Sequence, residues 1–263
     1  MARNYPKVDR KYGYILGIKI SITSKEEVLN LINLRLENKE KFYIVTPNPE
    51  NLLLATKDWL LAKAIRRSDL SIPDGIGLKF AYKFLHNEDI EIIKGRELFL
   101  EVIKIANDRK LRVYLFGGEH GEQIKTKEVL EKQYSNVIFK TNFEFPQYNK
   151  NCKPITYEDR NLHKKIIGGI KLFEPDLIIV ALNTPKQEKW IYRNFFRLNA
   201  TGAFALGGTF NYVAGNMKLP PKWMEKLGLE WVCRLIQEPK RWRRIINAVI
   251  IFPWSVFVWK LRK

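Results

Sequence analysis

An aspartate in a tight corner is the first residue of the chain that could carry out chemistry. Asp74 lies in the segment Pro73-Asp74-Gly75, directly after the apolar residues Leu70 and Ile72. A carboxylate held at such a corner can take a proton from a hydroxyl group, as a general base does. Pro-Asp-Gly is also an ordinary turn sequence, because proline presets φ and glycine accepts a positive φ. Asp74 is therefore a candidate base, with a plain turn as the alternative.

Two further corners place polar side chains after apolar, strand-like runs. Thr46 and Asn48 follow residues 42–45, and the run 176–182 leads into Asn183-Thr184-Pro185-Lys186-Gln187-Glu188. Both corners also have a purely structural interpretation, since Asn48 before Pro49 is typical of a helix N-cap and Thr184 with Gln187 predicts a capping box. Capping and ligand binding are compatible, so both corners remain candidates.

Two glycine pairs end strand-like runs and could face a phosphate group through their backbone N–H groups. Gly117-Gly118 follows residues 111–116, and Gly207-Gly208 follows residues 203–206. Glycine turns between a strand and a helix are typical phosphate-binding loops. Neither pair matches a Walker or Gly-x-Gly-x-x-Gly motif, so a tight turn is an equal interpretation.

The elements that must position these residues alternate between strands and helices. Short apolar runs separated by amphipathic segments predict an α/β fold of Rossmann-like type, a mostly parallel sheet of five or six strands with helices on both faces. The carboxyl ends of parallel strands meet at one edge, so the corners at Thr46, Asp74, Gly117, Asn183 and Gly207 should converge on one crevice. We expect one helix over residues 49–67, and a loop over 142–159 with Cys152 exposed.

The charge of the chain indicates a polyanionic partner or surface. The formal net charge is +18 over 263 residues, and nucleic acid, anionic lipid and a diphosphate substrate all fit it. Residues 217–263 contain eleven Lys/Arg, three Glu and five of the seven tryptophans. Basic residues interleaved with tryptophan are typical of a membrane interface, although a core-packing helix would also explain the apolar stripe in residues 242–250. We therefore divide the chain into a catalytic core, residues 1–218, and a membrane-associating appendage, residues 219–263.

The cysteines and histidines indicate which cofactors and which cellular compartment to expect. Cys152 and Cys233 have no metal-type spacing, and the scattered His86, His120 and His163 do not predict a zinc site. Residues 1–14 lack the apolar region of a secretory signal, and no uninterrupted run of about 18–20 apolar residues predicts a spanning helix. The expectation is a cytoplasmic protein, peripheral on the inner face of the plasma membrane, without cofactor or metal.

Three motifs in order resemble the bacterial WecG/TagA/CpsF glycosyltransferase family. They are Thr46-Pro47-Asn48, the turn from Pro73 to Gly77, and Pro185 to Glu188, and the similarity runs over about residues 17–245. The resemblance implies an inverting, metal-independent transfer of an N-acetylmannosamine-type sugar from a UDP-sugar. The acceptor would be the C4 hydroxyl of N-acetylglucosamine on a polyprenyl diphosphate, in cell-surface polysaccharide or teichoic acid synthesis. N-acetylmannosaminuronic acid and glucose are the alternative donor sugars.

The resemblance also implies roles for residues at matching positions. Asp74 would be the base, and the substrate-binding residues would be Thr46, Asn48, Gln187, Arg234, Arg241 and Arg244. The family's usual arginine is Ile92 here, so Lys94 or Arg96 would substitute for it, and the usual aspartate after the second glycine pair is Asn211. For the nucleotide we expect contacts from Gly117, Gly118, Asn183, Lys186, Gly207 and Gly208.

Two other functions compete with this interpretation. The net charge and the Trp/Arg-rich end would also suit a non-enzymatic nucleic-acid-binding protein, although no nucleic-acid motif is present. A catalytically inactive membrane-binding relative is the other alternative, and the presence of Asp74 and Gln187 argues against it. We expect no nucleic-acid partner, and the sequence leaves a homo-oligomer open.

Overall fold

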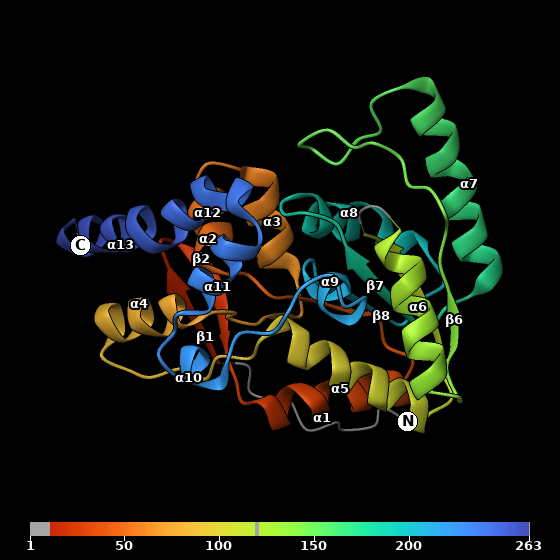
Figure 1. Cartoon of the computed structure of the whole chain (residues 1–263), viewed down its shortest axis with the longest axis horizontal. Helices are drawn as coiled ribbons and strands as arrows, with labels where there is room; N and C mark the ends of the chain where they lie inside the picture. The colour runs from red at the N-terminus through yellow and green to blue at the C-terminus, as the bar shows by residue number, and fades with distance from the viewer. Residues whose placement is uncertain (1–10, 119–120, 263) are drawn as a thin grey trace, which may run out of the picture.

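The computed structural model describes residues 11–118 and 121–262 (Figure 1). The basic residues 1–10, and His120 two positions after the first glycine pair, lie outside the described residues. The described part of the chain starts with an antiparallel hairpin, β1 (Lys11–Ile15) and β2 (Ile18–Ile22). Leu16 and Gly17 form its turn, and both have positive φ.

A parallel sheet of six strands organises the rest of the chain, as predicted. Its spatial order is β4-β3-β8-β7-β5-β6, and every neighbouring pair is parallel. The strands are β3 (Phe42–Val45), β4 (Leu70–Ser71), β5 (Arg112–Gly117), β6 (Ile138–Lys140), β7 (Leu177–Ala181) and β8 (Gly202–Ala205). Because all six point the same way, their carboxyl ends share one edge of the sheet.

Alternating side chains of each central strand enter two separate apolar clusters, one on each face of the sheet. In β7, Ile178 and Val180 join one cluster, whereas Leu177 and Ile179 join the other. The first cluster is covered by α2 (Pro49–Ala55), α3 (Trp59–Arg67), α4 (Ile76–His86), α7 (Tyr157–Phe173) and α8 (Lys186–Asn194). The second is covered by α1 (Lys25–Glu37), α5 (Gly95–Asp108), α6 (Glu122–Gln133) and α9 (Thr209–Val213). Burial on both faces explains why the strands are continuously apolar.

The single helix expected over residues 49–67 is two helices, α2 and α3. Helix α2 ends at Ala55, and Asp58 begins α3 as its N-cap, because its carboxylate accepts a hydrogen bond from the Leu61 N–H at 3.1 Å. The carboxylate also receives the ammonium group of the fully buried Lys189, with Nζ 2.5 Å from Asp58 Oδ2. A capping aspartate inside an amphipathic pattern therefore marks a helix boundary rather than a solvated turn.

Cys152 is buried, so the expectation of an exposed thiol in the 142–159 loop was wrong. The loop folds back on itself through a bridge between Tyr148 and Pro154, and the Cys152 side chain joins the first apolar cluster at 4% exposure. Burial raises the pKa of the Cys152 thiol to about 12. The cysteine is thus a small apolar packing residue in a loop of polar composition.

The carboxyl-terminal segment crosses the strand-end edge of the sheet as a series of helices. They are α10 (Lys222–Lys226), α11 (Glu230–Gln237), α12 (Trp242–Ile246), a π-helical turn at Asn247–Ile251, and α13 (Phe252–Leu261). The helical path continues through Pro253, because the wider π turn precedes the proline and accommodates a residue without an N–H donor.

One helix within the described residues, Pro239–Leu261, is long and apolar enough to cross a membrane by length and composition. The sequence had not predicted it, since the arginines and Lys260 interrupt the apolar run. Two of its side chains are nevertheless core residues, because Phe252 and Val256 are 0% and 2% exposed and pack in the first apolar cluster. The boundary predicted at residue 218 therefore separates two segments that share part of one core.

Candidate active site

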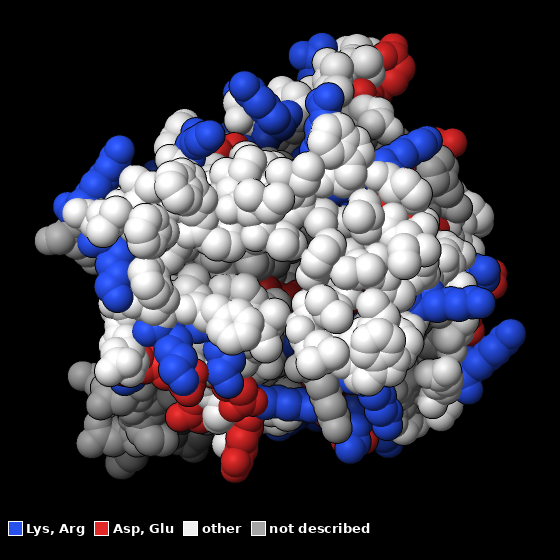
Figure 2. All heavy atoms as spheres, turned by 60° about the vertical axis from the view of Figure 1, so that its left-hand side comes forward, with Lys and Arg blue, Asp and Glu red and all other residues white. Residues whose placement is uncertain are grey.

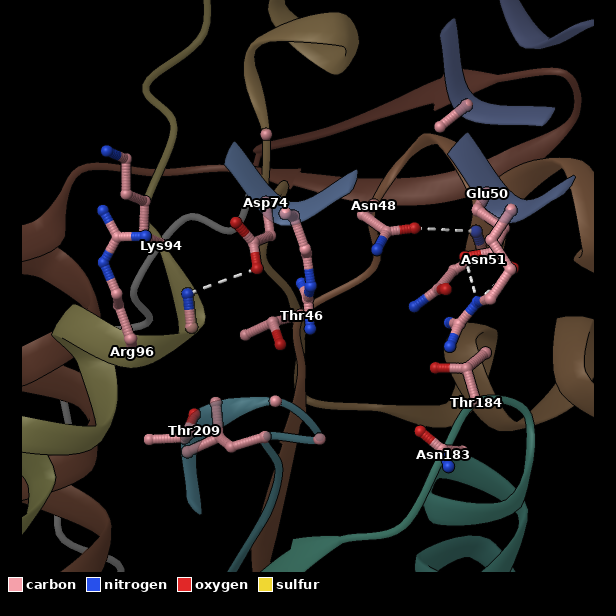
Figure 3. Close-up of a pocket in the computed structure, with 18 of the residues that line it drawn as sticks. Thr46, Asn48, Glu50, Asn51, Asp74, Lys94, Arg96, Asn183, Thr184 and Thr209 are labelled. Atoms are coloured by element: carbon pink, nitrogen blue, oxygen red, sulfur yellow. Dashed lines mark hydrogen bonds and ion pairs between the residues drawn. The ribbon is translucent and has the colours of Figure 1, made fainter. Parts of the chain in front are cut away.

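A pocket lies at the carboxyl ends of β3, β4, β7 and β8 and is also lined by residues of α11 and α12 (Figure 3). The predicted residues that line it are Thr46, Asn48, Asp74, Lys94, Arg96, Asn183, Gln187, Gly207, Gly208, Arg234, Arg241 and Arg244. The core supplies the carboxylate, amide and hydroxyl groups, and the carboxyl-terminal segment supplies the last three arginines. The corners predicted to converge from separate strands therefore do so, apart from the one at Gly117.

Asp74 is half-buried at the end of the pocket that Lys94 and Arg96 border (Figure 3). Its backbone N–H donates to the Pro47 carbonyl at 2.9 Å, which joins the two corners. Its Oδ2 accepts one hydrogen bond, from the Gly95 N–H at 3.3 Å. Burial raises the pKa of Asp74 to about 6, an effect opposed by the Gly95 hydrogen bond and by the Arg234 and Arg96 charges. A carboxyl group with such a pKa can accept a proton near neutral pH.

The Thr46 and Asn48 side chains are partly committed to the protein. Thr46 Oγ1 donates to the Ala205 carbonyl at 3.0 Å, and the Asn48 Oδ1 caps α2 by accepting from the Asn51 N–H at 3.0 Å. The N-cap interpretation of Asn48 is therefore confirmed. Because Asn48 also lines the pocket, its amide nitrogen is the part that a ligand can reach.

Lys94 and Arg96 form an ion-pair cluster with two glutamates of the carboxyl-terminal segment. Lys94 Nζ lies 2.5 Å from Glu230 and 3.4 Å from Glu225, while Arg96 donates to Glu230 at 2.9 Å and also pairs with Glu225. All four side chains are between 16% and 32% exposed. In this structure the two candidates for the missing arginine thus bind protein carboxylates, and they link α5 to α10 and α11.

The remaining arginines of the pocket also have carboxylate partners. Arg241 Nε lies 2.9 Å from Glu238, and Arg234 Nε lies 3.6 Å from the same residue. Gly208 allows Arg234 to approach closely, because a Cβ there would lie 3.0 Å from the guanidinium group. Arg244 contacts Glu50 at the first turn of α2. These contacts hold a set of cations over the strand ends.

The capping box expected from Thr184 and Gln187 does not form. Helix α8 begins after Pro185 without a side-chain cap, and both side chains turn instead toward the carboxyl group of Glu188. Gln187 is 3% exposed in the wall of the pocket, beneath Gly207. The fully buried Glu188, rather than the backbone of α8, is thus the hydrogen-bond partner of both side chains.

Gly117, Gly118 and Lys186 do not line this pocket. The Gly118 N–H donates to the Ala181 carbonyl at 2.9 Å, and a Cβ on Gly117 would lie 2.7 Å from that same oxygen. The glycine pair therefore allows β5 to pack closely on the end of β7, which is the tight-turn interpretation.

Several lining residues escaped sequence reasoning. They are Glu50, Asn51, Thr209, Tyr212, Glu230 and Trp231. Glu50 and Asn51 follow Asn48 directly, so their position in the first turn of α2 was the available signal. Glu230 and Trp231 carried none, because only the fold brings α11 to the strand ends.

The fold and the pocket define an α/β enzyme with its site at the carboxyl edge of a parallel sheet. Comparison with known proteins gives the particular family. The profile described as "Glycosyl transferase WecG/TagA/CpsF family" matches residues 13–263, and the chain belongs to this glycosyltransferase family.

Named relatives agree with this assignment. A protein of Bacillus subtilis (strain 168), named N-acetylglucosaminyldiphosphoundecaprenol N-acetyl-beta-D-mannosaminyltransferase, is 32% identical over 81% of this chain and 78% of its own length. A protein of the same name from Staphylococcus aureus (strain MW2) is 29% identical over 96% of this chain and 93% of its own length. The enzyme class thus prevails over the nucleic-acid-binding function that net charge alone had left open.

Proposed function

We propose that this glycosyltransferase moves an N-acetylmannosamine-type sugar from a UDP-sugar to N-acetylglucosamine carried on a polyprenyl diphosphate. The transfer serves the synthesis of a bacterial cell-surface polysaccharide or teichoic acid. The names of the relatives support the sugar and the acceptor. The observation that carries the proposal is Asp74, a half-buried carboxyl group with a raised pKa in a pocket bordered by arginines.

In the proposed reaction Asp74 removes the proton from the C4 hydroxyl of the acceptor. The hydroxyl oxygen attacks C1 of the donor sugar, and the bond from C1 to the phosphate oxygen breaks with its electron pair leaving on UDP. A single displacement inverts the configuration at C1. This route needs one base and an anion-binding group for UDP, rather than the carboxylate pair of a glycosidase.

Arg234, Arg241 and Arg244 bind the diphosphate in this proposal. All three line the pocket and come from the carboxyl-terminal segment. Guanidinium groups bind phosphate oxygens through two parallel hydrogen bonds and stabilise the charge that develops on the leaving group. The substrate diphosphate would replace the protein carboxylates that now pair with these side chains, and the transfer would proceed without a metal ion.

We further propose that the enzyme works at the cytoplasmic surface of an anionic membrane. Figure 2 shows a broad uncharged face with lysines and arginines at its margins, on the side where α4 and α13 lie. The carboxyl-terminal segment and α4 carry several large exposed apolar side chains, among them Trp242, Ile250, Trp254 and Phe257 of the former and Phe80 and Phe84 of the latter. Apolar side chains beside basic ones are typical of a protein that lies in the membrane interface.

The proposed membrane face includes part of the core as well as the appendage. The rings of Phe84 and Phe257 stack with centroids 6.4 Å apart, and Lys260 Nζ donates to the Phe84 carbonyl at 2.5 Å. Because Phe252 and Val256 pack in the core on the opposite side of α13, the helix would lie along the bilayer surface rather than cross it.

The test is UDP release from a panel of UDP-sugars with a polyprenyl-diphosphate N-acetylglucosamine acceptor, in the presence of EDTA. The panel includes UDP-N-acetylmannosamine, its uronic acid and UDP-glucose. We expect acceptor-dependent release with the first donor, a product of inverted configuration, and loss of release in Asp74→Asn. Release that requires a divalent cation would contradict the metal-independent mechanism, and no release with any donor would contradict the proposed function.

A further inference from the structure

Glu188 is a fully buried carboxyl group directly behind the wall of the pocket. Its side chain is 1% exposed, and it does not line the pocket itself. Its Oε1 accepts hydrogen bonds from Gln187 Nε2 at 2.9 Å and from Thr184 Oγ1 at 3.3 Å. Both donors belong to residues that line the pocket. Glu188 therefore joins two wall residues from behind.

The opposite end of the Gln187 amide is unmatched. Its Oε1 has no hydrogen-bond partner within residues 11–118 and 121–262, although the side chain is 3% exposed. The amide lies beneath Gly207, which also lines the pocket and where a Cβ would collide with Oε1. A buried acceptor without a partner is unfavourable, so its retention in a pocket wall indicates a ligand that supplies the donor.

The hydrogen bond to Glu188 fixes which end of the amide is available. Gln187 Nε2 lies 2.9 Å from Glu188 Oε1, so the amide nitrogen faces the carboxyl group and the amide oxygen faces away from it. Without this acceptor the amide could rotate by half a turn and present its nitrogen instead. Burial disfavours the charged form of Glu188 and raises its pKa, so a carboxyl group at this position costs folding free energy when it is ionised.

We propose that Glu188 is a positioning residue that orients the Gln187 amide so that Oε1 accepts a hydrogen bond from an N–H or O–H group of the bound sugar nucleotide. The identity of that ligand rests on the proposed function, whereas the orientation of Gln187 does not. Matching donors on a UDP-sugar are the uracil N–H, the acetamido N–H and the sugar hydroxyls. Thr184 is held by the same carboxyl oxygen, so one buried group sets two contacts of the wall.

Two substitutions of Glu188 separate positioning from packing. Glu188→Gln keeps an oxygen acceptor for Gln187, whereas Glu188→Leu fills the space and removes the acceptor. Lys189→Met is the matched control, because Lys189 is equally buried on the same helix but contacts Asp58 and the Lys150 carbonyl. Gln187→Ala provides the background for a double-mutant cycle.

The first readout is kcat/KM for the donor, together with calorimetric binding of UDP and of UDP-N-acetylmannosamine. We expect Glu188→Leu to lower kcat/KM about tenfold, the size of one hydrogen bond, and Glu188→Gln to stay within about twofold of wild type. In the Gln187→Ala background Glu188→Leu should cost less than about twofold, because its effect passes through Gln187. Weaker binding of UDP itself would assign the donor group to the nucleotide, and weaker binding of the UDP-sugar alone would assign it to the sugar. An equal loss in both backgrounds would overturn the proposal.

The second readout does not depend on activity. Nuclear magnetic resonance reports the side-chain N–H protons of Gln187, assigned by their absence in Gln187→Ala. We expect slow exchange of these protons with solvent in wild type, Glu188→Gln and Lys189→Met, and fast exchange in Glu188→Leu. Unchanged exchange in Glu188→Leu would overturn the proposal. If wild type turned over no donor but this pattern held, the proposed function would fail while the role of Glu188 would stand.

Discussion

Arg244 donates its Nε–H to both carboxylate oxygens of Glu50, at 2.8 and 3.0 Å, and so joins the carboxyl-terminal segment to the first turn of α2. Both side chains line the pocket, at 34% and 20% exposure. In the proposed mechanism Arg244 binds the diphosphate, so the Glu50 carboxylate competes with the substrate for the Arg244 guanidinium group. The ion pair would keep Arg244 over the strand ends before the substrate arrives.

Glu50→Gln should therefore tighten the binding of UDP, since it removes the negative charge that competes for Arg244 while keeping the shape of the side chain. We expect a decrease in Kd of up to about fivefold, because a partly exposed ion pair contributes about 0.2–1 kcal/mol. Arg244→Gln should raise Kd by about tenfold or more, through loss of charge-assisted hydrogen bonds. Calorimetric titration with UDP measures both. Weaker binding in Glu50→Gln would instead mean that the carboxylate mainly positions Arg244.

Asp74→Asn should lower turnover about 10²–10⁴-fold, the usual range for a positioned general base. In wild type, kcat/KM should fall as the pH drops below about 6, because the raised pKa leaves Asp74 protonated there. Initial rates between pH 5 and 8.5 give the profile, with constant ionic strength as the control. Activity of Asp74→Asn near that of wild type would exclude Asp74 as the base.

The same substitution, Asp74→Asn, should raise the stability of the fold at neutral pH although it lowers turnover. The folded-state pKa of Asp74 lies above its unfolded value, so ionisation costs folding free energy as the pH rises from about 4 to 6. Asp74→Asn should therefore have the higher Tm at pH 7.5, and the advantage should disappear near pH 4. Thermal unfolding followed by circular dichroism at both pH values measures this difference. A lower Tm at pH 7.5 would show that the carboxylate stabilises the fold.

The cluster of Lys94, Arg96, Glu225 and Glu230 should hold α10 and α11 against the core. Replacing both cations, with Lys94→Gln and Arg96→Gln, should speed hydrogen exchange in residues 222–237 by about fivefold or more, as local opening becomes about 1 kcal/mol easier. Lys25→Gln is a control, because it breaks an ion pair with Glu101 outside the cluster. Unchanged exchange in residues 222–237 would mean that apolar contacts alone hold these helices.

The sheet could be predicted because its strands are buried on both faces and read as short apolar runs. The convergence of Thr46, Asp74 and Asn183 also followed from the sequence, since parallel strands end at one edge. The ion pairs did not, because Arg244 and Glu50 are separated by 194 positions and Arg96 and Glu230 by 134. Contacts over such distances have no local pattern of spacing or propensity.

Local sequence patterns did not predict the structure where the same pattern fits two different roles. Thr184 and Gln187 match a capping box, yet both turn to Glu188, whose burial no sequence window reveals. The stripe in residues 242–250 suited either a membrane anchor or a core helix. In the structure no residue of this stripe is buried, and the contact with the core comes later, where Phe252 is buried while Trp254, two positions on, is 65% exposed.

Substitutions on the two sides of α13 should therefore have opposite effects on folding and on membrane binding. Trp254→Glu should lower partitioning to vesicles with anionic lipids by about tenfold or more, because it replaces exposed apolar area with a negative charge, and should leave Tm nearly unchanged. Phe252→Ala should cost about 3–5 kcal/mol of unfolding free energy, as expected for a buried aromatic side chain. Sedimentation with vesicles and chemical denaturation measure the two quantities.

Deleting residues 219–263 would remove more than the membrane-associating segment. It would abolish vesicle binding, but it would also remove Phe252 and Val256 from the apolar cluster that α2 and α4 share. We therefore expect the truncated chain to unfold at a lower denaturant concentration than the full chain, with apolar surface exposed on α4. Full stability of the truncated chain, together with unchanged vesicle binding by Trp254→Glu, would contradict the placement of α13 between core and membrane.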